Sequence, residues 1–253
     1  NFGSCIAMPI IYLSPSTQDW NPYVNGGTEE YWMNLLADKM VPYLDASGIR
    51  YSRNTPDMTA ASSIAASNAG NYDFHLALHS NAAAGDQAGK ARGSIVFYYP
   101  GSADGKRAAE LIADGLKTIY PDPNKVRTEA TTTLGEVARV RAPAVLIELA
   151  FHDNVEDANW IKANLDAAAR VIVLALTEYF GIPFFETEHR RPGIVDVEWG
   201  NLNIRARPDT SAPVVAQAPD GAPLTIINTA NGWHLVNYNG AIGYASSRFV
   251  TVV

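Results

Sequence analysis

The chain has 253 residues, of which 47% are hydrophobic and 18% are charged, a balance that excludes intrinsic disorder. A formal net charge of −7 argues against a nucleic-acid partner, and no apolar run approaches the roughly 18 residues that a membrane span requires. The single cysteine, Cys5, excludes an intrachain disulfide framework and a metal site built from several cysteines. The length allows one large domain or two.

Strand-like and helix-like patterns alternate over the first part of the chain. The apolar run 8–13 predicts a buried strand. Thr28 is a good N-cap, so a helix is expected to begin there with Glu29 and Glu30 in its first turn. Further elements are expected, in chain order, at 49–53 (strand), 58–68 (helix), 72–81 (strand), 93–99 (strand), 102–119 (helix), 143–151 (strand) and 156–181 (helix). This alternation predicts an α/β sheet covered by helices on both faces.

The pattern changes in the last third of the chain. Residues 185–193 are polar, charged and irregular, which indicates a linker between a first domain at 8–184 and a second at 194–253. The second region contains short strand-like runs separated by turn signals such as Asn231-Gly232 and Asn239-Gly240. Closely spaced short strands of this kind predict a small β-barrel.

Three residues that suit metal chemistry lie at the ends of predicted elements. In open α/β sheets the reactive residues gather beyond the carboxyl ends of the strands. His79 ends one strand, Glu148 lies at the end of another and Glu30 opens a helix, so the three are expected to converge on one edge of the sheet. Hydrolysis of an amide by zinc uses three protein ligands, one open coordination position and a general base.

Each of these residues also has a purely structural interpretation. Glu30 would complement the helix dipole, and His79 would form an ordinary hydrogen bond at the end of its strand. Glu148 is different, because a carboxylate inside the apolar run PAVLIELAF is costly to bury unless it is paired or used.

Three further segments carry a family pattern when they are taken in order. They are EYWMNLLADKMVPYLDASGIRYSRN, YDFHLALHSNA and PAVLIELAFHDN. Together they resemble the amidase-3 family of zinc-dependent N-acetylmuramoyl-L-alanine amidases, and the resemblance spans about 8–184. It implies a mostly parallel α/β sheet flanked by helices. It also implies cleavage of the amide between N-acetylmuramic acid and L-alanine in peptidoglycan, which would then be the partner.

The resemblance also implies roles for single residues. Glu30 and His79 would bind Zn2+, and Glu148 would polarise the metal-bound water and shuttle its proton. Family residues that look structural match Arg53, Asn81 and Asn154.

The opening loop departs from the family pattern. Where the family has D-P-G-H-G-G, this chain has SPSTQ at 14–18, which places Thr17 at the first metal histidine. Hydroxyl and amide oxygens are weaker zinc ligands than imidazole. Three groups are candidates to replace it: the carbonyl oxygen of Gln18, a second water, or His152 from the loop after its strand. His75 is expected to pack within the fold, because four residues along a strand cover about 13 Å.

The segments LNIRARPDTSAPVV, NGWHLVNYNG and GYASSRFV resemble a bacterial SH3-like (SH3b) domain. Domains of this kind accompany cell-wall hydrolases, so the resemblance implies that this region binds the wall. Trp199, Tyr238 and Tyr244 are candidates to line a wall-binding groove, and the barrel core is the alternative place for them.

Two functions fit the sequence. The first is a metal-dependent peptidoglycan amidase, and the second is a catalytically degenerate amidase that binds the wall without cutting it. A serine or cysteine hydrolase finds no support, because there is no G-x-S-x-G and Cys5 precedes the first strand. The expected location is extracellular or in the cell wall of a bacterium. The chain starts at Asn1 without an initiating methionine or a signal-peptide pattern, which leaves removal of a leader open. The sequence does not specify the oligomeric state.

Overall fold

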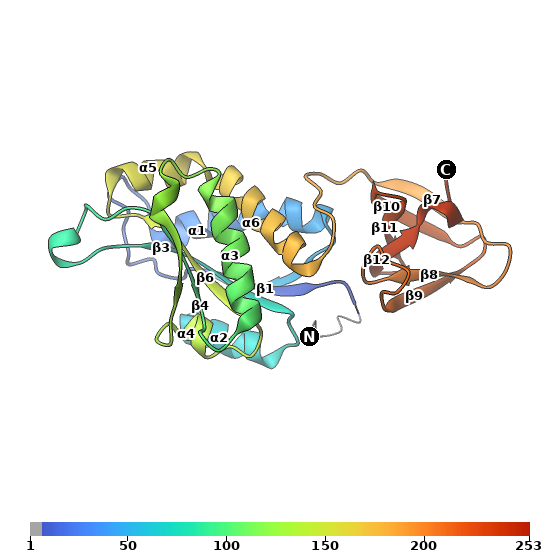
Figure 1. The fold of residues 1–253 in the computed structure, drawn as a ribbon, viewed down its shortest axis with the longest axis horizontal. Helices are drawn as coiled ribbons and strands as arrows, with labels where there is room; N and C mark the ends of the chain where they lie inside the picture. Colours follow the sequence, from blue (N-terminus) through green and yellow to red (C-terminus); the bar gives the residue numbers. More distant parts are fainter. Residues whose placement is uncertain (1–6) are drawn as a thin grey trace. The chain divides into compact units, whose positions relative to one another are not determined.

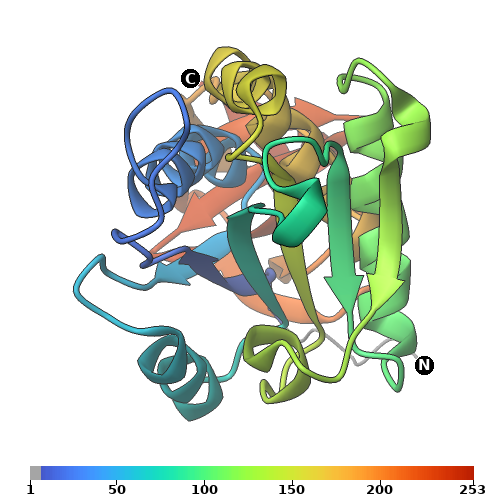
Figure 2. The same ribbon diagram turned by 90° about the vertical axis from the view of Figure 1, so that its left-hand side faces the viewer.

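The computed structural model describes residues 7–253, so Cys5 lies outside the described part of the chain (Figures 1 and 2). The described residues form two compact units. One contains 10–41 and 51–179, and the other contains 180–253 with short segments at 42–50 and just before Ile10. Within 7–253, no helix combines the length and the apolarity that crossing a membrane would take.

The first unit is built on a six-stranded sheet with the order β2-β1-β3-β6-β4-β5. Its strands are β1 (Ile10–Pro15), β2 (Arg50–Arg53), β3 (Phe74–Asn81), β4 (Ser94–Tyr98), β5 (Val126–Ala130) and β6 (Ala144–Phe151). The pairs β1–β3, β3–β6 and β4–β5 are parallel, whereas β4 and β6 are antiparallel. This confirms the predicted mostly parallel α/β sheet.

Helices lie on both sides of this sheet. They are α1 (Glu29–Ala46), α2 (Ala60–Ala69), α3 (Ala103–Lys117), α4 (Gly135–Ala138), α5 (Val155–Ala163) and α6 (Leu165–Phe180). In both views α2 and α4 lie below the sheet, whereas α1, α5 and α6 lie above it (Figures 1 and 2). Short 3₁₀ turns occupy 85–87, 123–125 and 247–249.

The helix expected at 156–181 is two helices. Asn164 lies between α5 and α6 with φ −123° and ψ 20°, outside the helical region. Its side-chain amide donates to the carbonyl of Trp160 (2.8 Å), so the end of α5 is capped locally. The apolar pattern continues through this break, which is why the sequence alone predicts one long helix.

The central strands β3 and β6 position the polar residues of interest. Both strands are almost entirely buried, as expected for apolar parallel strands covered on two faces. Their register pairs His79 with Glu148. The short helix α4 packs on the same strands through Val137, which contacts Ala77 and Leu146. This packing places α4 beside β3, where Glu136 reaches His79.

The second unit is an antiparallel sheet with the order β13-β7-β10-β11-β12-β8-β9. Its strands are β7 (Arg191–Val195), β8 (Asn201–Arg205), β9 (Val214–Pro219), β10 (Pro223–Ala230), β11 (Trp233–Tyr238), β12 (Ala241–Ser246) and β13 (Val250–Val252). Strand β7 begins inside the segment 185–193 that the sequence suggests as a linker.

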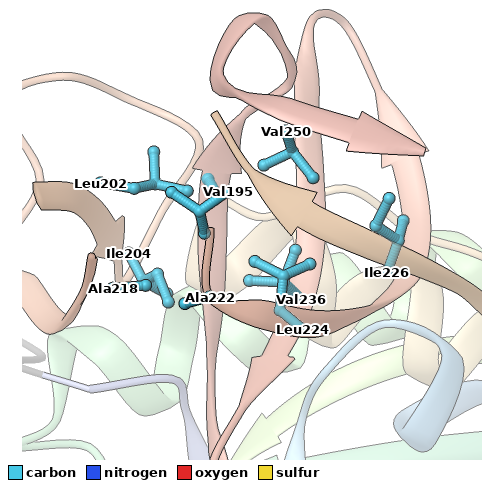
Figure 3. Packing of buried hydrophobic residues seen from close by; sticks show 10 residues of the cluster. Val195, Leu202, Ile204, Ala218, Ala222, Leu224, Ile226, Val236 and Val250 are labelled. Carbon is cyan, nitrogen blue, oxygen red and sulfur yellow. The ribbon is translucent and has the colours of Figure 1, made fainter. Parts of the chain in front are cut away.

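Alternating residues of these strands form one apolar core (Figure 3). The labelled members include Ile204, Ile226 and Val236, each fully buried. The predicted Asn-Gly turns join β10 to β11 and β11 to β12. Asn231 and Asn239 both have φ of 50°, and a glycine with positive φ follows each, which is the backbone that a tight hairpin requires.

Candidate functional site

His79 is held between two buried carboxylates at the carboxyl end of β3. Its Nδ1 lies 2.8 Å from Glu29 Oε1, and its Nε2 lies 2.9 Å from Glu136 Oε2. Burial disfavours a charged imidazole, but the hydrogen bonds to Glu136 and Glu29 outweigh it and raise the pKa of His79 well above its usual value. The histidine ring therefore has one carboxylate on each side.

The structure brings Glu29 to His79 instead of the expected Glu30. Glu29 is 2% exposed, whereas Glu30 is only partly buried and its carboxylate lies 3.4 Å from Asn34 Nδ2. Successive residues of a helix point about 100° apart, so only one of two neighbours at this turn can face the sheet. Asn21 fixes the choice, because its Nδ2 donates to Glu29 Oε2 (3.0 Å) and its carbonyl accepts from the Glu29 N–H (2.9 Å).

Glu136 is a site residue that the sequence reasoning missed. One of its oxygens accepts from the hydroxyl of Ser14 and lies 3.2 Å from His75 Nε2, and the other contacts His79. Burial alone would raise the pKa of Glu136, but hydrogen bonds from His75 and His79 lower it to about 2. His75 is itself buried, as expected, and its Nδ1 bonds to Ser67 Oγ (2.9 Å).

Glu148 presents the opposite electrostatic situation. Its Oε2 is enclosed and has no hydrogen-bond partner among the described residues. Burial raises the pKa of Glu148 to about 7, with nearby His79 lowering it and Glu29 raising it further. A carboxyl group that exchanges its proton near neutral pH suits a general base.

The opening loop contributes to a small cavity beside His79. The cavity has a volume of about 100 Å³, and its lining includes Thr17, Gln18 and Trp20 as well as His79 and Glu136. The loop therefore reaches the site with a hydroxyl and an amide where the family has a histidine. The Gln18 Oε1 accepts from the same Asn21 amide that supports Glu29.

His152 is fixed beside the opening loop and has no recorded contact with His79. Its Nδ1 bonds to Ser80 Oγ (2.9 Å), and its ring stacks on Tyr23 with 5.0 Å between centroids. Its carbonyl accepts from the Val24 N–H (3.0 Å), which ties the loop to the end of β6. Burial lowers the pKa of His152. In this arrangement it supports the loop.

The donors around His79 are of the kinds that zinc binds. Within residues 7–253, no three His, Cys, Asp or Glu side chains converge in a way that would hold a metal. The pair Glu29 Oε1 and His79 Nδ1 are nevertheless in contact, and carboxylate and imidazole are ordinary zinc ligands. Glu148 adds an unpartnered buried oxygen opposite His79. The site thus holds a carboxylate and an imidazole in contact, with a second carboxylate on the neighbouring strand.

A separate groove lies in the second unit. It has a volume of about 660 Å³, and its lining includes Trp199, Trp233 and Phe249. Trp199 is 87% exposed. Tyr244 is 1% exposed and does not line the groove, so its assignment to a groove is wrong. Tyr238 packs against the same core and does not line the groove.

The comparison with protein families decides the assignment of the first unit. Residues 17–178 match the family described as N-acetylmuramoyl-L-alanine amidase. The chain belongs to this amidase family. Residues 200–251 of this amidase-family chain match the bacterial SH3 domain, which agrees with the antiparallel sheet of the second unit.

Solved structures of amidases share the fold. AmiC2 of Nostoc punctiforme is 15% identical with a TM-score of 0.60, over 71% of this chain and 99% of that one. The catalytic domain of the CD27L endolysin, which targets Clostridia Difficile, is 24% identical with a TM-score of 0.56, over 68% and 97%. Among curated proteins, a sequence match is found to the N-acetylmuramoyl-L-alanine amidase YrvJ of Bacillus subtilis (strain 168), which is 35% identical over 51 residues, or 20% of this chain and 10% of YrvJ.

The family match supports peptidoglycan amidase activity and does not favour a catalytically degenerate module. The chain nonetheless spans only about a tenth of the curated relative that it matches.

Proposed function

We propose that this chain cleaves the amide between N-acetylmuramic acid and L-alanine in peptidoglycan, with zinc held by Glu29 and His79. The observation that carries the proposal is the buried carboxylate oxygen of Glu148, which has no hydrogen-bond partner among the described residues and comes from the register partner of His79 on the neighbouring strand. Zinc, when bound at such a site, supplies Lewis acidity and a water of lowered pKa. Gln18 and water are the candidates for the remaining ligand positions.

The protein groups have separate tasks in this proposal. Glu148, with its pKa near 7, accepts the proton of the attacking water and returns it to the departing amine of L-alanine. Asn21 holds Glu29 in place. The contact between Tyr23 and His152 holds the loop that leads into α1. Pre-set positions of this kind reduce the reorganisation that the reaction needs.

We further infer that the bacterial SH3 unit keeps the enzyme on its polymer. The groove beside Trp199 combines three large aromatic rings with charged side chains of both signs, which suits a polymer of sugars and peptides. An extracellular or cell-wall location follows from this substrate, and a role as a secreted autolysin fits it.

Removal of the metal tests the proposed reaction. The zinc-loaded protein is expected to release stem peptides with a free L-alanine amino terminus from purified peptidoglycan, measured by mass spectrometry. A strong chelator should lower this rate by about 100-fold or more, because water activation is lost, and added zinc should restore it. Equal activity without metal would remove zinc from the proposal. No cleavage by the zinc-loaded protein would instead favour the degenerate module.

Truncation of Trp199 tests the groove. Trp199→Ala is expected to weaken co-sedimentation with intact peptidoglycan by roughly tenfold, the effect of losing one exposed aromatic anchor. Val214→Ala is the matched control, because Val214 is an exposed apolar residue of the same unit that does not line the groove. Equal losses in the two variants, or none in either, would show that the groove does not bind the wall.

A further inference from the structure

One carboxylate, that of Glu136, joins the two buried histidines of β3. Its Oε2 contacts His79 Nε2 at 2.9 Å, and its Oε1 lies 3.2 Å from His75 Nε2. Glu136 is 5% exposed and comes from the one-turn helix α4, which Val137 attaches to β3 and β6. The family resemblance gives this residue no role.

The geometry of imidazole lets a single metal ion meet only one side of His79. The two ring nitrogens direct their lone pairs or protons away from each other, so one ion cannot meet both sides. The Nδ1 side carries Glu29. A metal bound there leaves Glu136 behind the ring, where it can only accept the Nε2 proton.

We propose that Glu136 is a positioning residue that fixes the tautomer and orientation of His79 for zinc. This inference rests on the proposed zinc site. Ligating histidines commonly donate their second N–H to a carboxylate, which orients the ring and raises its basicity as a ligand. In this chain Glu136 is that carboxylate: with zinc bound on the Nδ1 side, it would accept the Nε2 proton and so keep Nδ1 as the ligand atom.

The other contacts of Glu136 keep it in this place. Its Oε1 is already used by the Ser14 hydroxyl and by His75, and His75 is held in turn by Ser67. Asn54 Nδ2 lies 3.3 Å from the Ser14 hydroxyl and extends the network. If Glu136 moved to become a ligand itself, Ser14 and His75 would lose their partner in a buried site, which is costly.

Zinc affinity, measured by competition with a chromogenic chelator, tests this role. Glu136→Gln is expected to bind zinc about 10- to 100-fold more weakly than the wild type. With cobalt in place of zinc, its visible absorption bands should shift, because the His79 ring turns. Ser14→Ala, a milder change that removes a donor to Glu136, should weaken zinc binding by a smaller factor. Ser67→Ala is the matched control, since it disturbs the far end of the network and should change zinc affinity less than about threefold.

The outcomes separate this inference from the proposed function. If the wild type binds zinc and both Glu136→Gln and Ser14→Ala bind it equally well with unchanged cobalt spectra, Glu136 does not position His79. If Ser67→Ala weakens zinc binding as much as Glu136→Gln does, the effect is one of general packing and the inference fails. If the wild type binds no zinc, the proposed zinc site and this inference fail together.

Discussion

Replacing Glu148 with glutamine is expected to abolish amide cleavage and, at the same time, to stabilise the metal-free protein above neutral pH. The structural reason is the same for both effects. The Glu148 Oε2 is buried without a hydrogen-bond partner among the described residues, which makes it a strong base and an unfavourable buried charge. Loss of a general base lowers rates by about 100- to 10,000-fold.

The direction of the stability effect follows from the pKa. Burial raises the pKa of Glu148 from 4.5 to about 7, so the folded state binds this proton more tightly than the unfolded state. The free energy of unfolding of the wild type therefore falls as the pH rises from about 4.5 to about 7. The glutamine side chain of the variant cannot ionise, so its free energy of unfolding lacks this fall. The difference in free energy of unfolding, variant minus wild type, should therefore be larger at pH 8 than at pH 4 by up to about 3 kcal/mol.

Urea unfolding at pH 4 and pH 8 on chelator-treated protein measures the stability effect, and stem-peptide release on zinc-loaded protein measures activity. Glu129→Gln is a suitable control, because Glu129 is an exposed carboxylate on β5. It should change neither quantity by a measurable amount. An unchanged pH dependence in Glu148→Gln would show that the carboxylate is not strained in the folded protein. Retained cleavage would exclude it as the base.

The neighbouring glutamates of α1 should give sharply different variants. Glu29→Gln is expected to lower zinc affinity by about 100-fold or more. The proposed site has two protein ligands, the Glu29 carboxylate and the His79 imidazole, and this change removes the buried carboxylate. Glu30→Gln should bind zinc within about threefold of the wild type, since its carboxylate has no recorded contact with His79. Cleavage rates at limiting zinc should follow the same order.

This pair of variants distinguishes Glu29, which the structure places at His79, from Glu30, which the sequence predicts as the ligand. Both residues occupy the first turn of the same helix, so a general effect on helix capping would be shared between them. A larger loss of zinc affinity in Glu30→Gln would restore Glu30 as the ligand. Equal and small losses would remove α1 from the metal site.

Sequence patterns predict the first unit well because its central strands are covered on both faces. Continuous apolar runs mark such strands, and polar residues within them stand out, as His79 and Glu148 do. The sequence predicts Glu30 instead of Glu29 as the metal ligand, because the helix pattern does not show which of the two side chains faces the sheet. The helix pattern shows where α1 begins, but the backbone of the preceding loop, through Asn21, decides which carboxylate turns inward.

Glu136 could not be found from the sequence for a different reason. It lies on a single helical turn that has no periodic pattern of its own. Its partners Ser14 and His75 are 122 and 61 residues away along the chain, so only the folded sheet brings them together. A buried acidic residue at such a position has no local signal.

The sequence pattern does not show which aromatic residues of the second unit are buried and which line the groove. Tyr244 is buried on β12, next to the core residue Ala245, whereas Trp199 is exposed in a loop before β8. The sequence shows which residues alternate, but the face that becomes the core depends on how the strands pair. Trp233 and Phe249, which line the groove, cannot be distinguished from core residues for the same reason.

The stacking of Tyr23 on His152 has a consequence for ligand affinity. Tyr23 lies just before α1, the helix that carries Glu29, and His152 lies just after β6, the strand that carries Glu148. The stacking therefore joins the two segments. The two sides of the site are thus set at a fixed spacing during folding, before any ligand arrives. The conformational entropy of this loop is lost in folding, so binding of metal and substrate does not have to order it again.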